Sequence, residues 1–397
     1  MKTNTDEKLI AQITTRGVEN IYPKLEFLES RLKSGERLTI YTGYDPTAPT
    51  LHIGHGITML KLRQFQDLGH KIIMLIGDFT GMIGDPTDKT SARQKLTKEE
   101  VKNNFKDYKK QAAKILNFSG NNKVEVKYNS KWLSKMDFSD ILELTSHFTV
   151  PRLLERDMFQ ERLKEGKTVY LHEFMYPVMQ AYDSVMMDVD GEVGGNDQTF
   201  NMLCGRDLMK GLKNKEKFVI TGKLLTDNSG KKMGKTEGNM IALSDSPEDM
   251  FGKVMSWTDE MIGHGFELCT RIPMGEVEEI KKAMTGGANP RDFKLKLAYE
   301  ITKTFLGEAE AEQGKAHFEQ VIQSKDKPEE MKEFSPSKND IITVLVEAEF
   351  VKSTTEARQN IKGGGVRIND EKVESIDAEV KSGDIIQKGK RFFVRIV

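Results

Sequence analysis

Cysteine and long apolar runs are scarce in this sequence. Its 397 residues include two cysteines, Cys204 and Cys269, and neither belongs to a CxxC pair. This argues against a disulfide framework or a thiolate zinc site, and for a reducing compartment. The first residues carry no apolar signal segment, and no run of about 18 apolar residues follows. We therefore expect a cytoplasmic protein with no membrane partner.

Excess charge of one sign is also absent. Sixty Lys and Arg residues face 61 Asp and Glu residues, so the formal net charge is −1. This balance argues against a histone-like basic protein, although an RNA site can still lie on one local basic face. A chain of this length is too long for one compact core, so we expect two or three domains.

Strand and helix patterns alternate through the first half of the sequence. Leu38–Thr42 and Lys71–Ile76 predict buried strands, and His52–Leu68 between them has apolar residues near helical spacing. This order predicts a βαβ unit and therefore a parallel sheet. Thr97–Glu100 is typical of a capping box, and it predicts a long helix that ends near Phe118.

The alternation continues to residue 229. We expect a strand at Lys123–Tyr128, mostly helices over 133–182, a helix from about Asp197 to Leu212, and a strand at Phe218–Leu225. These elements predict an α/β fold with a Rossmann-like parallel sheet, in which residues 133–182 form a helical insertion.

The second half changes character twice. After a loop and linker at 230–245, Ser246-Pro247-Glu248 is a good helix start, and residues 246–323 predict an all-α domain. Residues 324–337 have almost no apolar content, which is typical of a linker. Residues 338–397 predict a small α+β domain with a glycine turn at 363–365.

The most informative stretch joins the first predicted strand to the next helix. It reads Tyr41-Thr42-Gly43-Tyr44-Asp45-Pro46-Thr47 and then Leu51-His52-Ile53-Gly54-His55. Open parallel sheets bind nucleotides at such a loop, and helix N-terminal amides favour phosphate. His52 and His55 share one helix face, and Gly54 removes a side chain where a purine can lie. The same residues can also be a metal pair, ordinary polar residues at a helix start, or turn glycines.

A lysine-rich segment follows the last predicted strand of the α/β part. Lys231-Lys232-Met233-Gly234-Lys235-Thr236 lies between Gly230 and Gly238. Such a loop can close over a triphosphate and neutralise the charge that develops as pyrophosphate leaves. It can equally be a solvated surface, so it carries weight only together with the first segment.

Together the two segments resemble the HIGH and KMSKS motifs of the class I aminoacyl-tRNA synthetases. His52-Ile53-Gly54-His55 matches HIGH at every position. Lys232–Thr236 matches KMSKS with glycine for the first serine and threonine for the last. KFGKT-like variants of this kind are familiar in the tyrosyl branch.

A third segment indicates which amino acid is bound. Tyr176, Gln180 and Asp183 are spaced i, i+4 and i+7, so on a helix they share one face. If that face is buried, these polar groups need partners, whereas on an exposed face they need none. The segment is similar to that of bacterial tyrosyl-tRNA synthetases, and matches across nearly the whole chain include Tyr41, Asp85 and Gly194–Gln198.

This resemblance implies a role for each matching residue. Tyr41 and Asp183 are expected to hydrogen-bond the phenolic hydroxyl of tyrosine, and Gln198 to lie near its carboxylate. Its ammonium group would be held by Asp85, Tyr176 and Gln180. The expected neighbours of the adenylate are Gly43, Asp45, Gly54, Asp197 and Lys235. The expected phosphate contacts are Thr47, His52, His55, Lys89, Arg93, Lys232, Lys235 and Thr236, and Asn129 and Trp132 also fit the family spacing.

The resemblance also implies substrates and partners. Tyrosine and ATP would give tyrosyl-adenylate, and the tyrosine would pass to the terminal adenosine of tRNA(Tyr). Mg²⁺ is expected to arrive with ATP, held mainly by its phosphates, with no permanently bound metal. A homodimer is expected through apolar helices within residues 133–165.

The C-terminal part resembles an S4-type RNA-binding domain, with a short helix at Ser353–Ile361, a glycine turn and a strand to Asn369. Its expected phosphate contacts are Arg358, Arg367, Lys388, Lys390 and Arg391, which can also be part of a solvated surface. Residues 246–323 would help to bind the anticodon arm.

Two other functions stay open on the sequence alone. A tryptophanyl-tRNA synthetase shares the fold, although Asp183 with Tyr41 suits a phenol and the S4-like tail favours tyrosine. A non-catalytic RNA-binding paralogue would keep the fold without the chemistry. Both histidines and both lysines of the two motifs are present, which argues against that loss.

Overall fold

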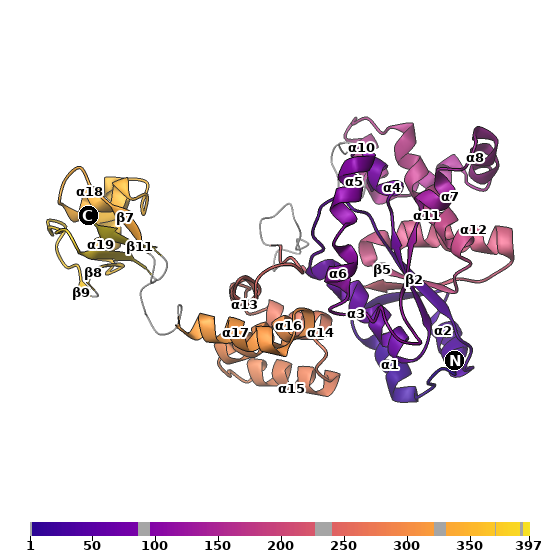
Figure 1. Cartoon of the computed structure of the whole chain (residues 1–397), viewed down its shortest axis with the longest axis horizontal. Helices are drawn as coiled ribbons and strands as arrows, with labels where there is room; N and C mark the ends of the chain where they lie inside the picture. The colour runs from indigo at the N-terminus through magenta and orange to yellow at the C-terminus, as the bar shows by residue number, and fades with distance from the viewer. Residues whose placement is uncertain (1, 86–95, 227–239, 321–330, 370, 390–391) are drawn as a thin grey trace. The chain divides into compact units, whose positions relative to one another are not determined.

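Two sheets organise the chain in the computed structural model, which describes residues 2–85, 96–226, 240–320, 331–369, 371–389 and 392–397 (Figure 1). One sheet belongs to a compact unit at Met1–Gly314 and the other to a unit at Lys315–Val397. The α/β part and the predicted helical part therefore share the first unit.

The first sheet is doubly wound. Its order is β1 (Val18–Tyr22), β6 (Phe218–Gly222), β5 (Gly191–Gly195), β2 (Thr39–Tyr44), β3 (Lys71–Ile76) and β4 (Glu125–Tyr128). Neighbouring strands are parallel except β1 with β6. From β2 the chain winds through α3 (Ile53–Asp67) to β3, and from β5 it winds the other way through η1 (Asn196–Gln198) and α12 (Thr199–Lys213) to β6. Right-handed crossovers then place α3 and α12 on opposite faces, and the winding switches between β2 and β5.

The predicted βαβ unit is confirmed. Five successive residues of β3, from Ile72 to Ile76, are at most 2% exposed, as expected for a strand covered on both faces. β2 pairs with β3 from Thr39–Lys71 to Tyr44–Ile76. Gly69 ends the helical stretch with a φ of 92°, a left-handed conformation that glycine adopts readily.

One predicted helix is wrong in its length. The capping box at Thr97 opens α5 (Lys98–Phe105) as expected, but a separate short helix, α6 (Tyr108–Ala112), replaces the continuation to Phe118. Asparagine and aspartate near the break have low helix propensity. Asn104 donates to the Pro46 carbonyl at 2.8 Å and Tyr108 to the Ala48 carbonyl at 2.7 Å. These tertiary bonds tie the loop after β2 to both helices.

The helices up to residue 187 lie around this sheet, whereas the series that begins at residue 247 forms a group of its own (Figure 1). Before β2 come α1 (Glu7–Thr15) and α2 (Leu25–Lys33), and α4 (Thr80–Ile83) follows β3. The largely helical stretch predicted after β4 is confirmed as α7 (Ser130–Leu133), α8 (Phe138–Thr145), α9 (Val150–Leu154), α10 (Asp157–Lys164) and α11 (Leu171–Met187). The next helical series is α13 (Pro247–Met255), α14 (Met261–Cys269), α15 (Met274–Thr285), α16 (Pro290–Phe305) and α17 (Glu308–Phe318). Ser246 caps α13 by accepting from the Asp249 amide, as predicted.

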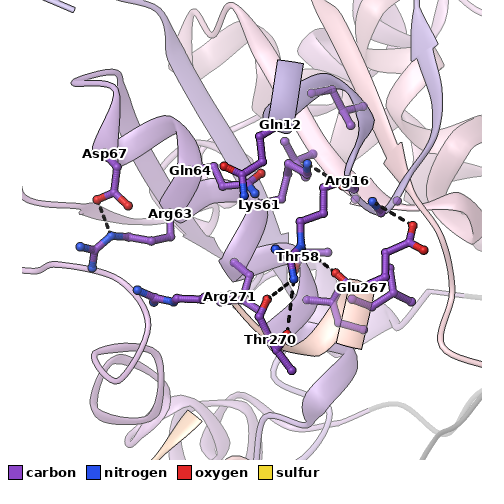
Figure 2. A pocket seen from close by; sticks show the side chains of 18 residues that line it. Gln12, Arg16, Thr58, Lys61, Arg63, Gln64, Asp67, Glu267, Thr270 and Arg271 are labelled. Carbon is purple, nitrogen blue, oxygen red and sulfur yellow. Dashed lines mark hydrogen bonds and ion pairs between the residues drawn. The ribbon is translucent and has the colours of Figure 1, made fainter. Parts of the chain in front are cut away.

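Arg16 joins the α/β part to this helical series. Arg16 is 6% exposed, and its guanidinium donates to the carbonyl oxygens of Phe266, Glu267, Thr270 and Ile272, where α14 ends. Figure 2 shows Arg16 beside Glu267 and Thr270. A cavity of about 180 Å³ lies beside this junction, lined by residues of α1, α3, β5, β6 and α14. None of the residues that line it is a predicted site residue.

The second unit has a sheet in the order β7 (Lys332–Phe334), β11 (Phe392–Ile396), β10 (Ile385–Lys388), β8 (Val366–Ile368) and β9 (Glu371–Lys372), with α18 (Ile341–Glu347) and α19 (Thr354–Lys362). The linker predicted over 324–337 is too long, because 332–334 form β7, parallel to β11. Phe334 packs against the apolar cluster of this unit, so a single aromatic residue anchors the strand. Within the described ranges, no helix combines the length and apolarity needed to span a membrane.

Candidate active site

The histidine pair lies where β2 leads into α3. His52 is the N-cap of α3, and its Nδ1 accepts from the Gly54 amide at 3.1 Å. His55 Nδ1 accepts from the His52 amide at 3.1 Å, and the two rings stack with centroids 3.8 Å apart. Because each Nδ1 accepts a hydrogen bond, the proton of each neutral ring is on Nε2. The reciprocal cap thus orients two Nε2–H donors at a helix N-terminus, which suits phosphate.

Glycine at position 54 has a structural reason that the sequence did not reveal. A Cβ there would lie 2.9 Å from Cε1 of His52 and 3.0 Å from its Nδ1. Any side chain would therefore push the capping imidazole out of place. At Gly43 the nearest atom to an added Cβ is Leu75 Cδ2 at 3.9 Å, an ordinary contact, so the protein itself does not demand glycine there.

Asp45 lies just after β2 and is held from several sides. Its Oδ1 accepts from the Thr80 hydroxyl at 2.7 Å, and its Oδ2 accepts from the Tyr176 hydroxyl at 2.8 Å. A Cβ at Gly77 would lie 1.9 Å from the Asp45 Oδ1, so only glycine fits beside it. The sequence interpretation included Asp45 and Tyr176 but missed Thr80 and Gly77.

Asp183 lies on the buried face of α11. It is 2% exposed and Tyr176 is 6% exposed, which excludes a solvent-exposed face for this segment. Its Oδ1 accepts from Trp132 Nε1 at 2.7 Å, and its Oδ2 accepts from Asn129 Nδ2 at 3.1 Å. Burial raises the pKa of the Asp183 carboxyl well above its usual range, and the two hydrogen bonds oppose that rise.

Tyr41 on β2 points its hydroxyl toward α11. It is fully buried, and its oxygen lies 2.8 Å from the Ser184 Oγ. Burial first, and then the negative charges of Glu192 and Asp183, raise the pKa of the Tyr41 phenol well above its usual value. On the same helix, Gln180 donates to the Glu192 Oε1 at 3.0 Å. Ser184 and Glu192 are further members of the site that sequence reasoning missed.

Asp85 follows α4 and joins two distant segments. Arg156, which precedes α10, donates to its Oδ1 at 2.6 Å, and Gln198 of η1 donates to its Oδ2 at 2.8 Å. Arg156 is 5% exposed, so this ion pair is largely shielded from water. Asp197 also lies on η1, where a Cβ at Gly195 would come within 2.5 Å of its Oδ1.

The remaining predicted site residues lie in the loop after β2, in the second unit, or outside the described ranges. Thr47 lies in the loop after β2, and its amide donates to the Asp45 carbonyl at 2.8 Å. In the second unit, Arg358 and Arg367 are exposed, whereas the Lys388 ammonium donates to the Phe350 carbonyl and lies 3.9 Å from Glu356 Oε1. The predicted residues outside the described ranges are Lys89, Arg93, Lys232, Lys235, Thr236, Lys390 and Arg391. Among described residues, no group of three or more His, Cys, Asp or Glu side chains is placed to hold a metal ion.

A doubly wound sheet that carries paired histidines at the N-terminus of α3 and a buried polar cluster beside its switch point defines a class I aminoacyl-tRNA synthetase domain. The family model described as tRNA synthetases class I (W and Y) matches residues 33–323, and the model described as the tyrosine–tRNA ligase SYY-like C-terminal domain matches 318–395. The tyrosine–tRNA ligase of Haemophilus ducreyi is 44% identical over 393 residues, 98% of each chain. That of Thermotoga maritima is 43% identical over 391 residues, 97% of this chain and 96% of the other. The chain therefore belongs to the tyrosine–tRNA ligases of this class I family.

Solved structures share the fold. The mitochondrial tyrosyl-tRNA synthetase of Aspergillus nidulans, C-terminally truncated, aligns with a TM-score of 0.67 at 21% identity over 80% of this chain and 94% of that one. The tyrosyl-tRNA synthetase of Archaeoglobus fulgidus, complexed with L-tyrosine, aligns at 0.61 with 22% identity over 79% and 100%.

Proposed function

We propose that the residues at the switch point carry out both steps of tyrosine–tRNA ligation. In the first step the tyrosine carboxylate attacks the α-phosphorus of ATP. A bond to that phosphorus forms while the α–β phosphoanhydride breaks, releasing pyrophosphate. In the second step a ribose hydroxyl of tRNA attacks the adenylate carbonyl and AMP leaves. Neither step needs a covalent enzyme intermediate, so the protein acts by positioning and charge stabilisation.

The observation that carries this proposal is the cluster of buried polar side chains on β2 and α11, in which Tyr41 and Asp183 are both buried. Asp183 can accept the phenolic proton of tyrosine, and Tyr41 can donate to the phenolic oxygen. Phenylalanine would leave both groups unpaired in a water-poor site, which penalises its binding. The substrate ammonium would be held by Asp85, Tyr176 and Gln180, and the substrate carboxylate would lie near Gln198.

The histidine pair and its neighbours would bind the nucleotide. Asp45, Asp197, Gly43 and Gly54 would lie along the adenosine, with Asp197 on the ribose. The phosphates would be contacted by Thr47, His52 and His55, joined by Lys89, Arg93, Lys232, Lys235 and Thr236. These contacts are needed mainly in the transition state, when charge develops on the leaving pyrophosphate.

Exchange of labelled pyrophosphate into ATP tests the assignment. We expect exchange with tyrosine and far less with tryptophan or phenylalanine. Exchange driven by tryptophan and not by tyrosine would contradict the pocket chemistry. Absence of exchange with every amino acid would favour a non-catalytic RNA-binding protein.

Magnesium is proposed as the metal that accompanies ATP. Mg²⁺ keeps several waters and is commonly bound through substrate phosphates with few protein ligands. Exchange should therefore stop with EDTA and return with added Mg²⁺. Zinc retained by the protein after EDTA treatment would contradict this proposal.

For the second unit we propose tRNA binding through its exposed basic residues, with residues 246–323 contacting the anticodon arm. Arg358 and Arg367 are exposed, and the Lys388 ammonium donates to the Phe350 carbonyl. Removing one phosphate contact should weaken tRNA binding and reduce its salt dependence. Arg358→Gln and Arg367→Gln in the full chain should do this without changing pyrophosphate exchange.

A homodimer in the cytoplasm is proposed as the working form. Large apolar side chains are exposed on α8, α9 and α10, where Phe138 is 74%, Leu142 56%, Val150 67% and Leu163 49% exposed. Apolar surface of this kind often marks a protein interface. Sedimentation should show a dimer that Leu142→Asp weakens, and a monomer in the unaltered chain would contradict the proposal.

A further inference from the structure

A fully buried ion pair lies behind the phenol-binding residues. Lys217, just before β6, is 0% exposed, and its ammonium pairs with Glu192 of β5, which is 2% exposed. Gly205 of α12 makes room for it, since a Cβ there would lie 2.6 Å from the Lys217 Nζ. Burying two charges has a large desolvation cost, and well-packed apolar residues of similar volume are often as stabilising. The place of this pair beside the proposed pocket therefore suggests a use beyond stability.

The Lys217 ammonium begins a chain of hydrogen bonds that leads to Tyr41. Its Nζ lies 3.0 Å from the Ser184 Oγ, which in turn lies 2.8 Å from the Tyr41 hydroxyl oxygen. An ammonium can only donate, so Ser184 accepts from Lys217. Since the pKa of the Tyr41 phenol is raised, its oxygen keeps a proton throughout the working pH range.

On the other side of the proposed phenol site lies Asp183, which acts as a hydrogen-bond acceptor where Tyr41 acts as a donor. Burial raises the pKa of Asp183, but both of its oxygens accept from protein donors, which is the bonding pattern of the ionised form. In that form Asp183 can only accept, and each oxygen retains a further lone pair. A phenol placed between Tyr41 and Asp183 would accept from one side and donate to the other. Hydrogen bonds in such a row polarise one another.

We propose that Lys217 is a positioning residue that sets the direction of this row and so determines specificity for tyrosine. Lys217 donates to Ser184, and Ser184 donates to the Tyr41 oxygen. Tyr41 then keeps its proton for the phenolic oxygen of tyrosine, whose own proton goes to Asp183. The inference rests on the proposed roles of Tyr41 and Asp183. Glu192 already hydrogen-bonds the Tyr41 hydroxyl and competes with the substrate for its proton. Without Lys217 to pair with Glu192 and donate to Ser184, the Tyr41 proton can stay directed at Glu192 or turn to Ser184, and the site no longer offers a fixed donor to the substrate.

The double variant Lys217→Met/Glu192→Gln tests the proposal. It removes both charges with little change in volume, and the introduced amide oxygen can still accept from Gln180. Pyrophosphate exchange gives kcat/KM for tyrosine and for phenylalanine. We expect their ratio to fall about tenfold, which corresponds to about one neutral hydrogen bond. The fall should come through KM for tyrosine, with KM for ATP unchanged.

Ser184→Ala removes the hydroxyl between Lys217 and Tyr41 and keeps the Lys217–Glu192 ion pair. It should lower the ratio of kcat/KM for tyrosine to kcat/KM for phenylalanine by a similar factor. The matched control is Arg162→Met/Glu173→Gln, which removes another buried pair, 3% and 5% exposed, from α10 and α11. This control should change Tm but leave the ratio as it is.

An unchanged ratio in both the double variant and Ser184→Ala would overturn the inference, whatever happens to Tm. Tyr41→Phe separates this failure from that of the pocket itself. If Tyr41→Phe lowers the ratio while the other two variants do not, the phenol site stands and the role of Lys217 is wrong. If Tyr41→Phe also leaves the ratio unchanged, the proposed phenol site is wrong as well.

Discussion

The substitution Asp183→Asn should weaken the recognition of tyrosine with little change in the free energy of unfolding. It has two effects on folding, a lost hydrogen bond and the removal of a buried charge, and these oppose each other. Trp132 and Asn129 donate to different oxygens of the carboxylate, and in the amide one of these positions becomes an NH2 group that cannot accept. One buried donor left without a partner costs about 1–3 kcal/mol. The same substitution removes a buried carboxyl whose raised pKa shows that its charged form is disfavoured there. We therefore expect the free energy of unfolding to change by no more than about 1 kcal/mol.

For the binding of tyrosine, no second effect of Asp183→Asn offsets the lost hydrogen bond. A hydrogen bond from the tyrosine phenol to a charged acceptor contributes about 1.5–3 kcal/mol. Its loss should lower kcat/KM for tyrosine roughly 10- to 150-fold. Phenylalanine makes no such bond, so its kcat/KM should stay nearly constant and the ratio between the two should fall.

Pyrophosphate exchange with both amino acids measures this ratio, and urea unfolding measures stability. Trp132→Phe is the control, because it removes one donor to Asp183 and keeps the carboxylate. It should reduce the ratio much less than Asp183→Asn does. Equal losses for tyrosine and phenylalanine in Asp183→Asn would refute the reasoning, since they would indicate general damage to the site.

Three further perturbations follow from the structure. His52→Ala should slow adenylate formation with little change in KM for tyrosine and lower stability by about 1 kcal/mol, whereas His52→Ser keeps a capping oxygen and should restore only the stability. Arg16→Met strands the carbonyls at the end of α14, so urea unfolding should show a loss of at least about 3 kcal/mol. Burial lowers the pKa of His70 from 6.5 to about 4, so its contribution is complete above pH 6.5 and is lost as pH falls toward 4. Between pH 7 and 4.5, unfolding should show the unaltered chain losing about 2–3 kcal/mol more than His70→Asn.

Local patterns were sufficient for much of the fold and for part of the site. The apolar run of β3, the capping box at Thr97 and the Ser246 helix start all depend on neighbouring residues, and each was predicted correctly. The shared face of Tyr176 and Asp183 follows from helical spacing alone, and both side chains are buried.

Features that depend on distant residues could not be predicted. The helix expected to reach Phe118 breaks because Asn104 and Tyr108 bond carbonyls about sixty positions earlier in the chain. The Lys217–Glu192 pair forms because β5 and β6 are neighbours in the sheet. Nothing in the sequence around either residue distinguishes a buried charge from a solvated one.

The site is already paired within itself before substrate arrives, and this constrains how tyrosine can bind. Asp85 accepts from Arg156 and Gln198, and Gln180 donates to Glu192. A substrate ammonium at Asp85 must share that carboxylate with Arg156 or displace it. An ammonium that displaced Arg156 would leave the buried guanidinium in need of a new acidic partner, since an unpaired buried charge is costly.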